Sequence, residues 1–160
     1  MDTRVLKILA DDARCTVEDI ATMTGMSEEE VKKNIKELEE AGIIRGYKTV
    51  IDWEKLDNAS VSALIELKVI PQEEYGFEKI AETVMKYREV ETVYLMSGSY
   101  DLTVIVKGKT FQEVAMFVAK ELATMHGVTS TATHFVLRRY KELDVVLVGE
   151  DKDDRGAYSL

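Results

Sequence analysis

Cysteine, proline and long apolar runs are scarce in this sequence. The single cysteine, Cys15, has no partner for a disulfide within the chain, which fits a reducing compartment. The first residues lack the apolar core of a secretory signal, and no stretch is long and apolar enough to span a membrane. One proline and nine glycines in 160 residues indicate dense regular structure. We therefore expect a cytoplasmic protein with no membrane partner.

The usual signatures of catalysis and metal binding are also missing. The two histidines, His126 and His134, and Cys15 are scattered, without the spacing of a metal site. There is no Gly-x-Ser-x-Gly motif, phosphate loop or dinucleotide fingerprint. We expect no enzyme, no cofactor and no metal.

Positive charge is scarce too. The formal net charge is -9, and residues 1–52 carry 8 Lys/Arg against 12 Asp/Glu, a net of -4. Such a chain cannot bind nucleic acid through bulk positive charge. Any DNA contact must come from a locally basic face.

The N-terminal third has the pattern of three short helices. Apolar residues recur at helical spacing over residues 3–11, and capping residues open further helices at Thr16 and Ser27. A glycine-containing turn separates the last two, and Gly42 is expected to end the third helix in a left-handed conformation. Residues 43–52 follow as a short hairpin-like or extended stretch. The order predicts a winged helix-turn-helix domain over residues 1–52.

The pattern changes after a linker at residues 53–59. From residue 60 the order is strand, helix, strand, strand, helix, strand, and residues 143–148 are a possible further strand. This α+β order predicts a ferredoxin-like βαββαβ domain over residues 60–149, with helices on one face of an antiparallel sheet. Residues 150–160 are expected to be a flexible tail.

The predicted strands carry more apolar residues than one helix-covered face needs. We therefore expect the second face of the sheet to be buried against another copy of the chain, as a homodimer. The residues that motivate this are Val61, Leu64, Val93, Leu95, Leu102, Val104, Phe135 and Leu137.

The third helix holds the candidate DNA contacts. Lys32, Lys33 and Lys36 lie away from its apolar stripe, and Ser27 and Asn34 are the candidate polar contacts on the same helix. The alternative is a solvated helix face, which the three glutamates at 28–30 favour because they suit a helix N-terminus but repel phosphates.

Several motifs together resemble the leucine-responsive regulator/asparagine regulator (Lrp/AsnC) family over residues 3–148. They are the Asp12-x-Arg14 turn, the Gly25-Met26-Ser27 turn, the stretch from Leu38 to Tyr47 and the step Gly98-Ser99-Tyr100-Asp101. Asn34, where a basic residue is usual, and Ala13, where glycine is common, depart from the pattern. The resemblance implies a transcription regulator of double-stranded DNA whose dimers associate further, as in an octamer, around amino-acid pockets.

The Gly98–Asp101 step is also the candidate effector site on chemical grounds. Gly98 permits close approach to the backbone, Ser99 offers a hydroxyl, and Asp101 can accept a hydrogen bond from a ligand ammonium. Tyr100 either contacts the ligand or packs in an interface. Thr131 and Thr133 on the last strand add hydroxyls. The structural alternative is a tight turn followed by threonines that simply favour a strand.

Two other functions stay open. The acidic N-terminal domain is compatible with a metabolite-binding oligomer that has lost strong DNA binding. The two-domain layout is also similar to that of some tetrapyrrole decarboxylases, which would need basic and histidine residues around a large pocket.

Overall fold

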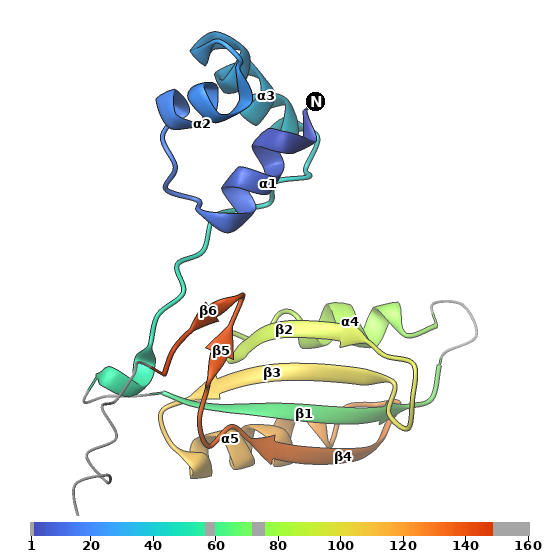
Figure 1. Ribbon diagram of the computed structural model, residues 1–160. Helices are drawn as coiled ribbons and strands as arrows, with labels where there is room; N and C mark the ends of the chain where they lie inside the picture. Colours follow the sequence, from blue (N-terminus) through green and yellow to red (C-terminus); the bar gives the residue numbers. More distant parts are fainter. Residues whose placement is uncertain (1, 57–59, 72–75, 149–160) are drawn as a thin grey trace, which may run out of the picture. The chain divides into compact units, whose positions relative to one another are not determined.

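The computed structural model describes residues 2–56, 60–71 and 76–148 (Figure 1). Contacts divide the chain into two compact units, Met1–Val50 and Ile51–Leu160. The short helical turn η1 (Trp53–Lys55), which lies in the predicted linker, belongs to the second unit. The predicted tail at 150–160 falls outside the described residues.

Three helices form the N-terminal unit: α1 (Thr3–Asp11), α2 (Val17–Thr24) and α3 (Glu28–Glu40). Each sends apolar side chains into one small core, whose buried members are Val5, Leu9, Ile20 and Val31. This is the predicted helix-turn-helix arrangement.

The ends of these helices are fixed by local hydrogen bonds. At the start of α3, the Ser27 hydroxyl accepts from the Glu30 N–H, while the Glu30 carboxylate accepts from the Ser27 N–H, which confirms the predicted capping box. At the other end Gly42 has φ 67°, as predicted, and the N–H groups of Ile43 and Ile44 both donate to Leu38 O.

Residues 43–52 leave α3 as an extended segment. Within the described part of the chain this segment pairs with no strand, so the extended form is present and the hairpin is not. The Tyr47 hydroxyl donates to Glu39 Oε1 at 3.0 Å, which fastens the segment to α3.

The C-terminal unit has the predicted ferredoxin-like order. Its sheet runs β2-β3-β1-β4, and every neighbouring pair is antiparallel (Figure 1). The strands are β1 (Val61–Val69), β2 (Val90–Leu95), β3 (Leu102–Gly108) and β4 (Val128–Phe135). The helices are α4 (Glu78–Val84) and α5 (Phe111–Phe117), with α5 extended by a wider turn, η2 (Val118–Leu122). Two short strands, β5 (Lys141–Glu142) and β6 (Val145–Val146), form a separate hairpin.

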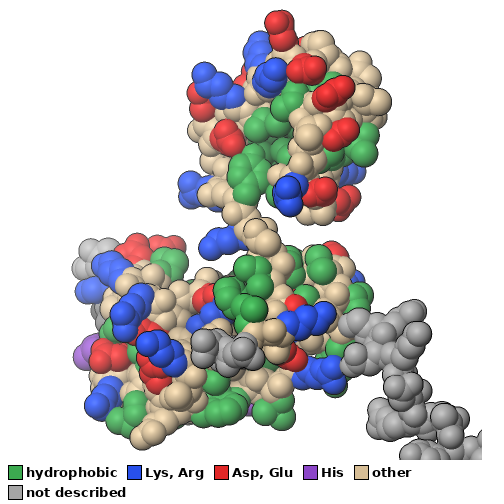
Figure 2. Space-filling view, turned by 90° about the vertical axis from the view of Figure 1, so that its left-hand side faces the viewer, with side chains coloured by type: hydrophobic (Ala, Val, Ile, Leu, Met, Phe, Trp, Pro, Cys, Tyr) green, Lys and Arg blue, Asp and Glu red, His purple; other side chains and the backbone are tan. Residues whose placement is uncertain are grey.

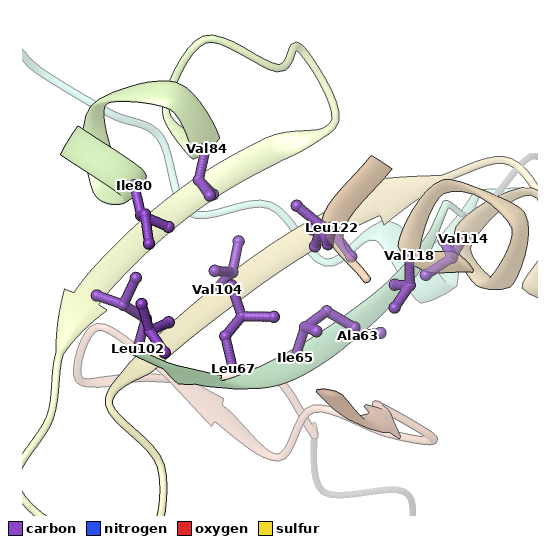
Figure 3. Close-up of a cluster of buried hydrophobic side chains, with 12 residues drawn as sticks. Ala63, Ile65, Leu67, Ile80, Val84, Leu102, Val104, Val114, Val118 and Leu122 are labelled. Carbon is purple, nitrogen blue, oxygen red and sulfur yellow. The ribbon is translucent and has the colours of Figure 1, made fainter. Parts of the chain in front are cut away.

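The core of this unit lies between the sheet and its two helices. Ile80 and Val84 of α4, and Leu122 of η2, point at the same face of β1 and β3, where Leu67 and Val104 are fully buried (Figure 3). Alternation along β1 and β3 puts every second side chain on this face.

The strand register corrects the argument from surplus apolar residues. Leu102 and Val104 are buried under the helices, and Val61, Val93 and Phe135 pack against the same core. Leu95 pairs with Leu102 and so shares its face, while Leu137 lies beyond the end of β4. Leu64 is the only one of the eight on the opposite face, which we call the open face. That face is mixed in character, with Ser62, Leu64, Glu66, Lys68, Tyr94, Thr103, Ile105, Lys107, Ser130, Ala132 and His134.

Candidate functional site

The three lysines of α3 are exposed, as a DNA contact requires, but two are already in ion pairs. Lys32 Nζ lies 3.2 Å from Glu28 Oε2, and Lys36 Nζ lies 3.6 Å from Glu40 Oε1. Lys33 has no ion-pair partner within residues 2–56. Exposed pairs of this kind contribute little, so a phosphate can replace the glutamate as the partner of either lysine. Figure 2 shows the resulting mixture of blue and red side chains on the viewed face of this unit.

Asn34 does not lie where the sequence analysis placed it. Its side chain is 6% exposed, and its Oδ1 atom is buried with no hydrogen-bond partner among the described residues. Asn34 follows Val31 by three residues and precedes Leu38 by four, so all three share the core face of α3. The helical spacing contained this information, and as placed Asn34 is no surface contact for DNA.

Ser27 remains at the surface, where its first task is to cap α3. Its hydroxyl lies 2.8 Å from Glu30 Oε2. The Ser27 backbone N–H, followed by the hydroxyl, lowers the pKa of Glu30. Any contact of Ser27 with DNA would have to coexist with this cap.

Two basic residues that the sequence analysis did not consider lie next to α3. Arg45 and Lys48 are exposed on the extended segment, and residues 43–51 contain no Asp or Glu. The absence of acidic residues is a signal that a charge count by segment would have found.

The Gly98–Asp101 step connects β2 to β3. The Met96 N–H donates to Asp101 O at 2.8 Å, while the Asp101 N–H donates to Leu67 O at 3.0 Å. Gly98 and Ser99 are exposed between these bonds, and Tyr100 is half-buried. A Cβ atom on Gly98 would meet no heavy atom within 4 Å, and the backbone there is not left-handed. This fold therefore does not itself require glycine at position 98.

Asp101 is held inside the fold rather than presented to a ligand. Its Oδ2 accepts from the Val69 N–H at 2.8 Å, and its Oδ1 lies 3.2 Å from Lys68 Nζ. The Val69 bond is the main cause of a lowered pKa for Asp101, and the Lys68 ammonium adds to it. The β1–β4 register shifts between Lys68 and Val69. Asp101 thus ties the start of β3 to this irregularity, and both of its oxygens already have partners.

The two threonines lie on the other side of β1 from the step. Leu102 pairs with Leu67, which in turn pairs with Thr131, so the step and Thr131 lie at the same end of the sheet. Thr133 pairs with Ile65, two residues further along. Both threonines are half-buried on the helix side of the sheet. The structure therefore brings Thr131 nearer to the step than Thr133, with β1 between them.

Other kinds of site find no support in the described residues. No three His, Cys, Asp or Glu side chains there are grouped so as to hold a metal ion. Nor does that part of the chain contain a helix that could cross a membrane.

The fold joins a helix-turn-helix unit, the usual form of a DNA-binding domain, to an α+β unit of ferredoxin-like order. Residues 1–45 match the family model for a winged helix-turn-helix DNA-binding domain, and residues 62–146 match that for the Lrp/AsnC ligand-binding domain. The protein belongs to the Lrp/AsnC family.

Curated relatives and solved structures agree with this assignment. The chain is 43% identical to the uncharacterized HTH-type transcriptional regulator YugG of Bacillus subtilis, over 96% of this chain and 93% of YugG. It is 32% identical to the regulator FL11 of Pyrococcus abyssi, over 89% and 91%. A Neisseria meningitidis transcriptional regulator, NMB0573, solved as a complex with L-Met, has the same fold, with TM-score 0.71, 24% identity and coverage of 89% and 93%.

Proposed function

We propose that this chain regulates transcription by binding DNA through α3, and that an amino acid modulates this binding from the Gly98–Asp101 step. The single observation that carries the proposal is the pairing, in one chain, of a DNA-binding helix-turn-helix unit with an Lrp/AsnC ligand-binding unit. The relatives are named as transcriptional regulators, and we propose no catalytic activity. The single cysteine fits action in the reducing cytoplasm.

For DNA recognition we propose Lys33 as the first phosphate contact, because its ammonium has no ion-pair partner within residues 2–56 that it must leave to bind a phosphate. Lys32 and Lys36 would follow by leaving their glutamates, and Ser27 lies at the N-terminal end of the same helix. Arg45 and Lys48 extend the basic surface. Asn34 is no longer part of the proposed site.

For the effector we propose that the exposed backbone at Gly98 and Ser99 meets the ligand, with Thr131 on the same end of the sheet and Thr133 beyond it. The support is that glycine at position 98 is not needed by the chain's own packing, so an approaching molecule can explain it. Tyr100 lies between Ser99 and Asp101 in the chain. Asp101 holds the step in place by accepting a hydrogen bond from the Val69 N–H. The L-Met complex of the Neisseria relative suggests an amino acid as ligand class.

The step is open to solvent, so enclosing a ligand there requires a second surface. We propose a homodimer formed through the open face, where Leu64, Tyr94, Ile105 and Ala132 are the apolar members. Association of dimers, up to an octamer, would then bring another subunit to the step.

A second candidate is a metabolite-binding oligomer with weak DNA binding. The observation that favours it is the pairing of Lys32 and Lys36 with glutamates, together with the net charge of -4 over residues 1–52. The decarboxylase alternative gains nothing comparable, because His134 lies on the open face, 3.0 Å from Glu66, and His126 is on a distant turn.

Calorimetry with the twenty amino acids tests the effector site. We expect at least one aliphatic amino acid to bind the wild type, and Gly98→Val to weaken its binding at least about tenfold by filling the space that the ligand needs. Because no atom lies within 4 Å of the added Cβ, the variant should unfold at the wild-type temperature. Unchanged amino-acid affinity in Gly98→Val would place the effector elsewhere.

A further inference from the structure

A second hollow, of about 740 Å³, lies in the C-terminal unit at the opposite end of β3 from the step. Its wall is built from three separate parts of the sequence: Ser60 before β1, Arg88 and Glu89 before β2, and the turn from Lys107 through Lys109 to Glu113 at the start of α5. Since β3 holds seven residues, the two ends are roughly 20 Å apart. The hollow is therefore a separate site from the step.

The turn that forms one wall packs closely against α5 and is hydrogen-bonded to it. A Cβ atom on Gly108 would lie 2.8 Å from Val114 Cγ2, so glycine lets the turn press directly onto α5. Glu113 Oε2 accepts from the Lys109 N–H at 2.7 Å, and the Thr110 hydroxyl accepts from the Glu113 N–H at 3.0 Å. The backbone that carries Lys109 is thus fixed at the rim of the hollow.

The charged side chains at the hollow differ in how free they are to bind a ligand. Lys107 lies 2.5 Å from Glu91, and Glu113 is held by its bond to the Lys109 backbone. The Lys109 ammonium has no hydrogen-bond or ion-pair partner within residues 60–71 and 76–148. The Arg88 side chain is 89% exposed and, among the described residues, pairs only with its neighbour Glu89, at 3.1 Å. Two cations from separate segments of the chain are therefore available to an anion.

We propose that this hollow binds a small dicarboxylate, with one carboxylate on Lys109 and the other on Arg88. The volume lies in the range of small-molecule sites. Charge-assisted bonds to two cations on separate elements favour a ligand with two anionic ends over one with a single carboxylate. This proposal does not rest on the amino-acid site at the step.

The hollow also borders the beginning of the C-terminal unit. Lys107 Nζ lies 5.3 Å from the centre of the Trp53 ring in η1, while its ammonium pairs with Glu91. A dianion beside Lys107 competes for that ammonium and so changes the surroundings of Trp53. Because Trp53 is the only tryptophan in the chain, a change at Lys107 can be followed by its fluorescence without interference from another tryptophan.

Succinate and L-leucine, titrated separately into the full-length protein, test the assignment. We expect succinate to bind by calorimetry and to change Trp53 fluorescence, both in the wild type and in Gly98→Val. Lys109→Ala should weaken succinate binding about tenfold, the usual size of one charge-assisted bond, with a similar loss in Arg88→Ala. Lys120→Ala, which removes an exposed lysine of η2 outside the hollow, is the matched control and should bind succinate as the wild type does.

Two results would overturn the proposal: no binding of succinate to the wild type, or wild-type affinity in Lys109→Ala. Loss of succinate binding in Gly98→Val would also overturn it, because succinate would then occupy the step. Failure of L-leucine and the other amino acids to bind, with succinate bound normally, would refute the effector proposal and leave this one standing.

Discussion

Replacing Asn34 with leucine should stabilise the N-terminal unit. The Asn34 side chain is 6% exposed, and its Oδ1 atom has lost water without gaining a partner. A buried unpaired acceptor costs about 1–3 kcal/mol, and leucine, which branches at the same atom, removes that cost and favours the helix slightly more. We expect Asn34→Leu to unfold at a higher temperature, by about 4–8 °C for each kcal/mol gained in a unit of this size.

Thermal unfolding followed by circular dichroism measures the shift, and a DNA-binding titration of the same variant measures the second consequence. Since Asn34 faces the core with Val31 and Leu38, DNA affinity should stay at the wild-type value. Asn34→Asp is the control, because it places a charge in the same position and should destabilise the unit. If Asn34→Leu lowered the unfolding temperature, or weakened DNA binding in a folded protein, the inward orientation of this side chain would be refuted.

Three further predictions concern charge and association. Lys33→Ala should lower the slope of log DNA affinity against log salt by about 0.9, and an unchanged slope would remove Lys33 from the interface. Asp101 has a lowered pKa in the folded state, so its stabilising effect is full above the unfolded value of about 3.9 and is lost as the pH falls through the folded value. Acid unfolding of Asp101→Asn should therefore depend less steeply on pH below about 4 than that of the wild type, and equal steepness would count against the Val69 bond. Ile105→Lys puts a charge on the open face and should give a monomer in sedimentation, whereas a stable dimer would exclude that face as the interface.

Local signals in the sequence were sufficient to predict the helices and strands and their order along the chain. The Ser27–Glu30 capping box and the left-handed Gly42 depend on residues within one or two turns of helix, and both are present. The strand and helix order likewise follows from apolar periodicity, which reports on local environment. These features need no knowledge of distant contacts.

What the sequence analysis missed depends on pairing between distant strands. Alternation alone does not say which face of β3 meets the helices. The sequence analysis therefore counted Leu102 and Val104 among the apolar residues left over for a dimer interface, whereas the strand register puts both in the core under the helices. The role of Asp101 depends on an irregularity in β1, 32 residues away, where the Val69 N–H is available. Asn34 is different, because its spacing from Val31 and Leu38 already placed it on the core face.

The central claim is that α3 binds DNA and that an amino acid at the step changes this binding. The most direct measurement is a titration of the full-length protein with its own upstream DNA at two salt concentrations, with and without the amino acid that calorimetry identifies. The account predicts affinity that falls with salt, a change in affinity on adding the amino acid, and loss of that change in Gly98→Val. Salt-independent or undetectable binding would contradict the DNA-binding claim, and a response that persists in Gly98→Val would contradict the proposed effector site.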